Sequence, residues 1–266
     1  MIGADNEAKR GLRVGERPDR VPSVDMKRQA MLLDVDGTLI DIAPAPDDVR
    51  VPECLKRSLE VLAARMDGAV ALVSGRPVAA LDALFAPLEL AAIGCHGAEM
   101  RVVSGADTMA RVPALGENIK QAYSDISALE PGVRVEDKTF SLAFHYRNIP
   151  DRETALLARI RDRSAAFAPQ LTLLQGKAVI EVKSGAFNKG EAVQDLMCHD
   201  PFAGRRPVFL GDDTTDDDVF AILGQIGGTG VCVGRRAENA EFTMVDPPEV
   251  RRWLAGLAAA AGTAQL

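Results

Sequence analysis

Short apolar runs alternate with amphipathic stretches in two separate parts of the chain, and this rhythm limits the possible folds more than any other feature. The first series spans residues 30–94 and the second spans residues 188–234. Apolar runs that alternate with helical patterns are typical of parallel strands joined by crossover helices. The sequence therefore predicts an α/β fold in which both series share one doubly wound, Rossmann-like parallel sheet.

The segment between the two series has a different pattern. It predicts a helix over 114–130, strands over 133–137 and 140–146, a helix over 152–167, and a strand pair over 171–175 and 177–183. We interpret residues 113–184 as a smaller α/β cap domain inserted into a core of residues 29–112 and 185–266. Proline and glycine place the expected hinges near Val112-Pro113 and Ser184-Gly185, so that the cap can close over the core and exclude water.

Charge and composition exclude several classes of partner. The 266 residues carry a net charge of −7, whereas nucleic acids and anionic membranes are bound by basic surfaces. No apolar stretch approaches the roughly 20 residues of a membrane span, and residues 1–28 alternate acids and bases, which indicates a mobile leader. The four cysteines are scattered without a metal-binding or redox spacing. We therefore expect a cytoplasmic monomer that acts on a small molecule, with neither nucleic acid nor membrane as a partner.

Two aspartates directly follow the first apolar run, where ligands bind in open α/β sheets. Asp34 and Asp36 are two residues apart, so in extended chain their side chains point the same way and can converge on one ligand. Gly37-Thr38 then predicts a tight turn whose backbone N–H groups can bind an anion. The alternative for a single aspartate at such a position is a helix cap.

More carboxylates follow a later apolar run. Asp212 and Asp213 end that run, and Asp216, Asp217 and Asp218 stand just beyond it. Carboxylates gathered at neighbouring strand ends need a positive counter-charge. Mg²⁺ is the expected ion because it takes about six oxygens, few of them from protein. We assign Asp212 to the metal, whereas Asp217 and Asp218 are explained by negative charge that favours a helix N-terminus.

Ser74 and Lys189 are the candidates for binding phosphoryl oxygens, which need hydrogen-bond donors and positive charge. Lys189 stands at the start of a predicted helix, where a lysine opposes the helix dipole. A functional role therefore explains this position better than the alternative of a solvated surface lysine.

This combination of residues resembles the haloacid dehalogenase-like (HAD) phosphatase superfamily. Its four motifs are matched by Asp34–Thr38, Ser74, Lys189 and Gly211–Asp213. The resemblance implies that Asp34 attacks phosphorus and forms an aspartyl-phosphate, while Asp36 serves as acid and then as base. It also implies that Ser74 and Lys189 hold the phosphate.

The same resemblance implies the metal ligands. Mg²⁺ would be bound by the Asp34 and Asp212 carboxylates and by the backbone carbonyl of Asp36. Asp213 would lie in the outer coordination sphere.

Finer motifs resemble the trehalose-6-phosphate phosphatase family over about residues 30–255. They are Ser74–Pro77, Cys95–Glu99, Glu136–Lys138, His145–Arg147, Gly176 through Glu181, and Gly211–Asp216. The resemblance implies hydrolysis of trehalose 6-phosphate to trehalose and phosphate. It implies a substrate-binding set of Gly75, Arg76, His96, Glu136, Lys138, Arg147, Lys177 and Glu181. Departures at Cys95 and Asp217 touch no catalytic role.

Several alternatives stay open for the cap. Its charges could form an ordinary ladder of cross-strand pairs, and His145 fits a structural role as well as a sugar ligand. His96 and Glu99 are expected at the edge of the site. The glycines between Gly224 and Gly230 precede a strand rather than open a helix, so they predict a turn and not a nucleotide site.

Two alternative functions also remain. One is a phosphatase of another sugar phosphate, such as a sucrose or a glucosyl- or mannosyl-glycerate phosphate. The other is a silent regulatory or phospho-receiver domain, although a receiver lacks the second acid that Asp36 supplies here.

Overall fold

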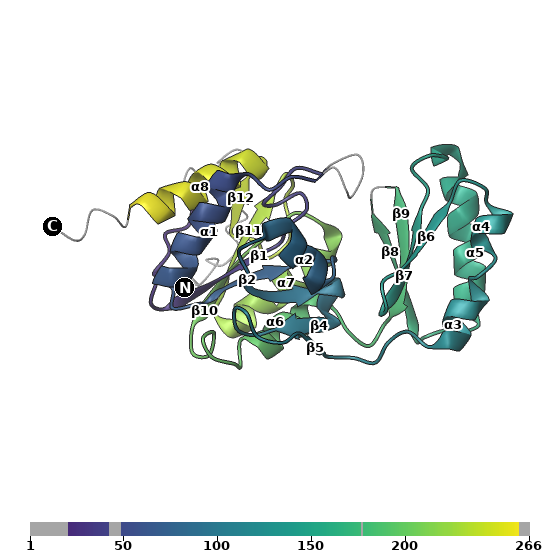
Figure 1. Ribbon diagram of the computed structural model, residues 1–266, viewed down its shortest axis with the longest axis horizontal. Helices are drawn as coiled ribbons and strands as arrows, with labels where there is room; N and C mark the ends of the chain where they lie inside the picture. The colour runs from purple at the N-terminus through teal and green to yellow at the C-terminus, as the bar shows by residue number, and fades with distance from the viewer. Residues whose placement is uncertain (1–20, 43–48, 177, 261–266) are drawn as a thin grey trace, which may run out of the picture.

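Two β-sheets organise the computed structural model, which describes residues 21–42, 49–176 and 178–260. The larger sheet contains, in spatial order, β12 (Phe242–Met244), β11 (Thr229–Val233), β10 (Arg206–Gly211), β1 (Gln29–Leu33), β2 (Val70–Val73), β3 (Ala91–Gly94), β4 (Glu99–Arg101) and β5 (Met109–Ala110). The smaller sheet contains β6 (Arg134–Asp137), β7 (Ser141–His145), β9 (Val179–Ser184) and β8 (Leu171–Gly176). Figure 1 shows the two sheets as separate bodies joined by two connections, one after β5 and one after β9.

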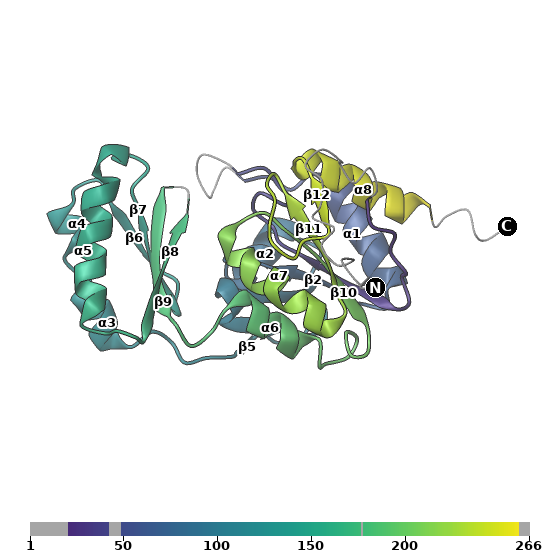
Figure 2. The ribbon, with the colours of Figure 1, turned by 180° about the vertical axis from the view of Figure 1, so that it is seen from behind.

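The larger sheet is parallel from β12 to β3, which confirms the doubly wound prediction. Helices α1 (Glu53–Arg65), α2 (Val78–Phe85) and α8 (Pro247–Ala259) cover the face seen in Figure 1. Helices α6 (Lys189–Leu196) and α7 (Asp217–Leu223) cover the opposite face, which is turned to the reader in Figure 2. Strands β2 and β3 are buried along their whole length because helices cover both faces of the sheet. The carboxyl ends of the parallel strands thus meet at one edge.

One edge of the larger sheet differs from the prediction. Strand β4 runs antiparallel to β3, and β5 runs antiparallel to β4; the sequence predicted neither of these two strands. The chain reverses through a short 3₁₀ turn in which Cys95, His96 and Gly97 have φ values of +49°, +56° and +105°. No apolar run indicates these strands, because they are only three and two residues long. The sequence also did not predict β12 and α8.

The smaller sheet is antiparallel throughout. Helices α3 (Glu117–Ala122), α4 (Ile126–Leu129) and α5 (Glu153–Ala165) cover its face away from the larger sheet (Figure 1). The single helix predicted over 114–130 was wrong, since the chain leaves helical geometry at Tyr123, with φ −112° and ψ 2°. The bend lets the Tyr123 ring pack against Phe144, with centroids 5.6 Å apart, while its hydroxyl lies 2.7 Å from Ser164 Oγ.

A small apolar cluster fills the contact between the two bodies. It consists of Cys95 and Ala98 after β3, Phe140 before β7, and Phe187 before α6, all buried. The cluster lies where the connection from β9 enters the larger body. In this arrangement the cluster packs the smaller body against the larger one, with the smaller sheet opposite the carboxyl ends of the parallel strands.

Residues 1–20 of the expected leader lie outside the described residues. Lys177 also lies outside them. Within residues 21–28, Val24 and Met26 pack against the core of the larger sheet. The boundary proposed for the leader stays a prediction.

Candidate active site

A cleft of about 380 Å³ lies between the carboxyl ends of the central strands and the smaller sheet. This volume lies within the range of about 300–1,000 Å³ that small-molecule sites typically have. The predicted site residues that line the cleft are Asp34, Asp36, Ser74, Gly75, Arg76, His96, Lys189 and Asp213 from the larger body, and Glu136, Lys138 and Glu181 from the smaller one. The fold thus gathers at one place residues that lie far apart in the sequence.

Lys189 connects two buried carboxylates. Its Nζ lies 2.8 Å from Oδ1 of Asp34 and 2.7 Å from Oδ1 of Asp216. Burial opposes the charge of the lysine, but Asp216 and Asp34 outweigh burial and raise the pKa of Lys189. Since only 3% of the Lys189 side chain is exposed, the alternative of a solvated surface lysine was wrong.

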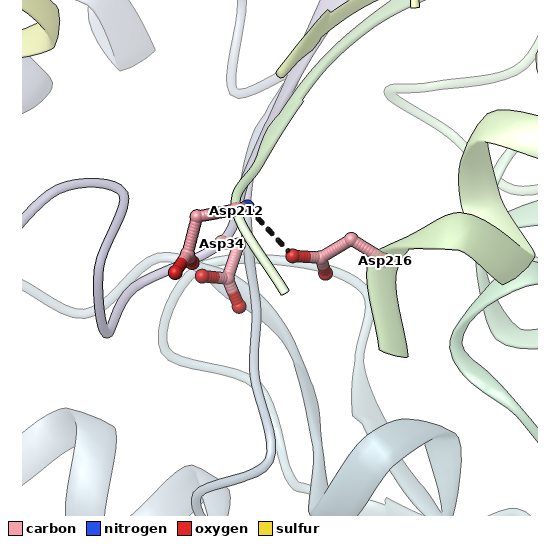
Figure 3. A group of neighbouring side chains, drawn as sticks. All are labelled: Asp34, Asp212 and Asp216. Atoms are coloured by element: carbon pink, nitrogen blue, oxygen red, sulfur yellow. Dashed lines mark hydrogen bonds between the residues drawn. The ribbon is translucent and has the colours of Figure 1, made fainter. Parts of the chain in front are cut away.

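Three carboxylates meet beyond the ends of β1 and β10. Asp34, Asp212 and Asp216 each offer an oxygen, and these oxygens lie within 4.8 Å of one another. Figure 3 shows the Asp34 and Asp212 carboxylates beside each other and Asp216 across the strand end. Oδ2 of Asp216 accepts the backbone N–H groups of Asp212 at 2.9 Å and Asp213 at 3.0 Å, while its Oδ1 meets Lys189. Asp34 and Asp212 are therefore the carboxylates best placed for a cation.

The charge balance of this group favours a bound cation. Burial raises the pKa of Asp34 well above its usual value, and Asp216 and Asp212 raise it further, whereas Lys189 opposes the shift. Burial and the charge of Asp216 raise the pKa of Asp212 to about 6. Both carboxyl groups thus resist ionisation in the absence of more positive charge, and an oxygen-binding divalent ion fits the donor set.

The position of Asp212 depends on the turn after Asp36. Thr38 Oγ1 donates a hydrogen bond to Asp212 Oδ1 at 3.1 Å. Gly37 has φ +92°, and a Cβ on it would lie 2.1 Å from Asp212 Oδ2, so only glycine fits both the backbone and the space. The predicted turn is confirmed. Its expected anion donors are engaged elsewhere, because Gly37 N–H donates to the Ile40 carbonyl at 2.8 Å and Thr38 N–H donates within the same loop.

Asp36 is held by a two-pronged ion pair. Arg76 Nε lies 2.6 Å from Oδ2 of Asp36, and Nη2 lies 2.7 Å from Oδ1. Ser74, directly after β2, is buried, and its Oγ accepts the backbone N–H of Arg76 at 3.2 Å. The Asp36 carboxylate therefore faces the cleft in a fixed orientation, beside the predicted phosphate-binding serine.

On the opposite wall, Glu181 of β9 is the centre of a polar group. Its Oε2 lies 3.0 Å from Lys138 Nζ and 3.6 Å from His96 Nε2, and its Oε1 accepts from Ser141 Oγ at 2.5 Å. Burial opposes ionisation, yet the contacts with His96, Lys138 and Ser141 hold the pKa of Glu181 well below its usual value. These contacts place a fixed negative charge and nearby donors where a polyhydroxyl ligand would meet the smaller sheet.

His96 reaches Glu181 from the larger body because Gly75 leaves room for its ring. A Cβ on Gly75 would lie 2.4 Å from Cε1 and Nε2 of His96. His96 Nδ1 is buried and has no hydrogen-bond partner in the part of the chain that the structure describes. The ring therefore joins the Ser74–Arg76 segment to the wall that carries Glu181.

The remaining predicted residues differ in placement. Glu136 Oε2 lies 2.8 Å from His145 Nε2, and both side chains line the cleft. Arg147 is exposed and is not among the described residues that line the cleft. Lys177 falls outside the described residues, so the roles of Arg147 and Lys177 stay predictions.

Sequence reasoning missed the role of Asp216. This residue is fully buried and holds both Lys189 and the Asp212–Asp213 backbone. Little in the sequence indicated this role, because negative charge that favours a helix N-terminus already explains three consecutive aspartates before a helix. That explanation is confirmed for Asp217 and Asp218, which occupy the first turn of α7.

Comparisons with known proteins agree with this site. A family model described as trehalose-phosphatase matches residues 32–243. The chain is 40% identical over 228 residues to a trehalose-6-phosphate phosphatase of Escherichia coli K12, and these residues cover 85% of each sequence. It is 38% identical to a probable trehalose-phosphate phosphatase of Sinorhizobium fredii, covering 80% of each. The structure of the C-terminal domain of a C. albicans trehalose-6-phosphate phosphatase superposes with a TM-score of 0.76 at 25% identity, covering 88% of this chain and 93% of that one.

Proposed function

The chain belongs to the trehalose-phosphatase family, and from that membership we propose that it hydrolyses trehalose 6-phosphate to trehalose and inorganic phosphate through a phosphorylated Asp34. It is accordingly a phosphoric monoester hydrolase of trehalose biosynthesis. The observation that carries the proposal is the cleft itself. One wall holds Asp34 and Lys189, with the Asp212 carboxylate close to Asp34, and the facing wall holds Glu181.

In the first half of the proposed reaction, a carboxylate oxygen of Asp34 attacks phosphorus. The bond from phosphorus to the sugar oxygen breaks, and Asp36 gives that oxygen a proton so that trehalose leaves as an alcohol. Lys189 supports this step by holding positive charge 2.8 Å from Asp34. When substrate fills the cleft, the ion pair between Asp36 and Arg76 must break so that Asp36 can contact the leaving oxygen.

In the second half, Asp36 takes a proton from water, and the resulting hydroxide attacks phosphorus. The bond to Asp34 breaks, which releases inorganic phosphate and restores both carboxyl groups. Mg²⁺, held by Asp34, Asp212 and the backbone carbonyl of Asp36, would supply positive charge beside the phosphoryl oxygens. Ser74 and Lys189 hold those oxygens from the protein side.

Residues 113–184 are proposed to act as a cap that recognises the sugar. Glu136, Lys138 and Glu181 bring acceptors and donors to the wall opposite Asp34, as a disaccharide with many hydroxyls requires. The cap would close about hinges near Val112-Pro113 and Ser184-Gly185. Identical small-angle scattering profiles with and without a bound substrate analogue would contradict this closure.

A substrate panel tests the proposed reaction. Phosphate release from trehalose 6-phosphate, sucrose 6-phosphate and p-nitrophenyl phosphate is measured with Mg²⁺ and with a chelator. We expect trehalose 6-phosphate to be the best substrate and the chelator to abolish turnover. Asp34→Asn should abolish release from every substrate. A preference for another sugar phosphate would support the alternative phosphatase, and no release at all would support a silent regulatory domain.

Cap variants test recognition of the sugar. Glu181→Gln keeps the size of the side chain but removes its charge, so kcat/KM for trehalose 6-phosphate should fall about 10- to 100-fold, as for the loss of a hydrogen bond to a charged group. Turnover of p-nitrophenyl phosphate should change little, because this substrate carries no sugar. Glu117→Gln, on an exposed side chain of α3, is the matched control on the same body. Equal losses for both substrates would refute a sugar-specific role for Glu181.

The cellular setting and assembly of the protein remain predictions. No helix among the described residues is both long and apolar enough to cross a membrane. The cysteines are all free, consistent with the cytoplasmic location we propose. Size-exclusion chromatography with light scattering tests the proposed monomer.

A further inference from the structure

Arg235, in the connection between β11 and β12, binds the backbone behind the carboxylate cluster. Its Nε donates to the carbonyl oxygen of Asp212 at 2.6 Å, and its Nη2 donates to the carbonyl of Asp213. Nη2 also pairs with Oδ1 of Asp217 at 2.6 Å. One guanidinium thus ties the end of β10 to the first turn of α7.

The contacts of Arg235 complete a clamp on a single peptide group. The peptide between Asp212 and Asp213 has its carbonyl bound by Arg235 and its N–H bound by Oδ2 of Asp216 at 3.0 Å. A peptide unit is planar, so bonds at both ends of this unit define its orientation. The N–H of Asp212 also donates to Oδ2 of Asp216 at 2.9 Å, so the peptide groups on both sides of the Asp212 Cα are held, and together they restrict the direction of its side chain.

That direction matters because Asp212 has little freedom on its other side. Its carboxylate accepts from Thr38 at 3.1 Å and lies against Gly37, where even a methyl group would collide. Several like charges surround it, since Asp34 and Asp216 offer oxygens within 4.8 Å. Mutual repulsion would push the loop away from the cluster, and Arg235 opposes that movement through neutral carbonyl groups, without neutralising the carboxylate of Asp212.

Arg235 does not belong to the catalytic wall. It lines a neighbouring hollow together with Gly37, Asp212 and Asp213. It is not among the described residues that line the cleft containing Asp34. Any effect of Arg235 on the reaction must therefore pass through the loop that it holds.

We propose that Arg235 is a positioning residue of the metal site, which clamps the Asp212–Asp213 peptide so that the Asp212 carboxylate is aimed at a divalent cation beside Asp34. This inference rests on the proposed function, because it takes Asp212 as a metal ligand. It assigns to Arg235 a share of the affinity for metal and no contact with substrate. Residues that orient metal ligands typically contribute a factor of 10–100 to metal affinity.

The test measures metal binding directly, on the full chain. Mn²⁺ is titrated into the purified protein, and free Mn²⁺ is followed by electron paramagnetic resonance, which requires no turnover. Arg235→Met should weaken Mn²⁺ binding about 10-fold or more. The Mn²⁺ affinity of Arg235→Lys should lie between those of wild type and Arg235→Met, because an ammonium group cannot hold two carbonyls and a carboxylate in one plane. At saturating metal, KM for trehalose 6-phosphate should stay within about twofold of wild type, since only the aim of Asp212 has changed.

Arg205 provides a matched control at the opposite end of the strands. Its Nη1 donates to the carbonyls of Met26 at 3.0 Å and Gln29 at 3.3 Å, and its Nη2 lies 3.1 Å from Asp67. Arg205→Met removes the same kind of clamp far from the carboxylates, so its Mn²⁺ affinity should equal that of wild type. Circular dichroism verifies that each variant is folded. If Arg235→Met does not fold, the Mn²⁺ affinity of Arg235→Lys is compared with that of wild type instead.

Two results would overturn the proposal in distinguishable ways. If folded Arg235 variants bind Mn²⁺ as tightly as wild type, Arg235 has no role in the metal site, and the proposed function is unaffected. If wild type itself binds no Mn²⁺, or if Asp212→Asn binds it equally well, the assignment of Asp212 as a ligand fails and the role of Arg235 fails with it.

Discussion

Replacing Lys189 with methionine tests whether its ion pairs hold the site together. In the folded chain, Lys189 Nζ lies 2.8 Å from Asp34 and 2.7 Å from Asp216, and all three side chains are buried. Methionine fills similar space but leaves two carboxylates together without their shared cation. Removing one partner from a buried ion pair typically costs about 3–5 kcal/mol of unfolding free energy. At about 2–4 °C per kcal/mol, Lys189→Met should lower Tm by roughly 6–20 °C near pH 8.

The loss should depend on pH in a defined direction. Burial, Asp216 and Asp212 raise the pKa of Asp34 above its usual value of 3.8, and Lys189 opposes them, so its removal raises that pKa further. A carboxyl group whose pKa is raised in the folded state destabilises that state once the unfolded chain loses the proton that the folded chain still holds. The penalty is therefore absent below the unfolded pKa, grows by about 1.4 kcal/mol per pH unit for each proton between the unfolded and the folded pKa, and is constant above the folded pKa. The difference in stability between Lys189→Met and wild type should be smaller at pH 5 than at pH 8.

Thermal unfolding followed by circular dichroism at several pH values measures this difference. Lys183→Met is the matched control, because Lys183 is equally buried but its Nζ donates to the neutral carbonyls of Ser184 and Phe187. Its stability loss should grow less between pH 5 and pH 8 than that of Lys189→Met, because its Nζ hydrogen bonds go to carbonyl groups. Mg²⁺ should recover part of the stability of Lys189→Met, since a cation that binds only the folded state shifts the equilibrium toward it. If Lys189→Met loses the same stability at pH 5 as at pH 8, the assigned role of the buried charges is refuted.

Three further perturbations test other parts of the site. Gly75→Ala should raise KM for trehalose 6-phosphate about 10-fold in steady-state kinetics, because the added Cβ would lie 2.4 Å from the His96 ring. Gly256→Ala is the control, because Gly256 has open space around it, and its KM should equal that of wild type. Metal affinity should fall as pH drops below about 6, because protons then compete for Asp212, whose pKa is raised to about 6; calorimetric titration giving equal Mg²⁺ affinity at pH 5 and pH 7 would contradict this. Arg101→Gln should lower unfolding free energy by about 1–3 kcal/mol, because it breaks the ion pair between the buried Arg101 and the partly exposed Asp82, while KM for trehalose 6-phosphate stays constant; an unchanged Tm would show that the pair contributes nothing.

The core fold was predictable because its signal repeats. Buried parallel strands have continuous apolar sequences, so residues 30–94 and 188–234 indicated their strands and helices without any knowledge of contacts. The predictions failed where the signal is short or depends on distant packing. Strands β4 and β5 follow a left-handed turn at Cys95–Gly97, and the break between α3 and α4 at Tyr123 depends on the packing of its ring against Phe144.

The positions of the candidate catalytic residues were predictable for a related reason. Asp34, Ser74 and Asp212 directly follow apolar runs, and the carboxyl ends of parallel strands meet at one edge whatever the loops do. Their assignment to phosphoryl transfer came from the resemblance of the motifs around Asp34, Ser74 and Lys189 to those of the haloacid dehalogenase-like phosphatases. Linear sequence contains the placement of the strand-end residues because that placement follows from local backbone geometry.

Tertiary structure alone decided how these groups are held. Asp216 and Arg235 clamp one peptide from opposite sides, and His96 reaches Glu181 across two bodies because Gly75 leaves room for its ring. Each of these contacts joins residues from different elements, and its existence depends on distances that no spacing along the chain defines. The sequence determined which chemical groups the protein has at its strand ends, and the packing of distant elements determined their orientation and charge.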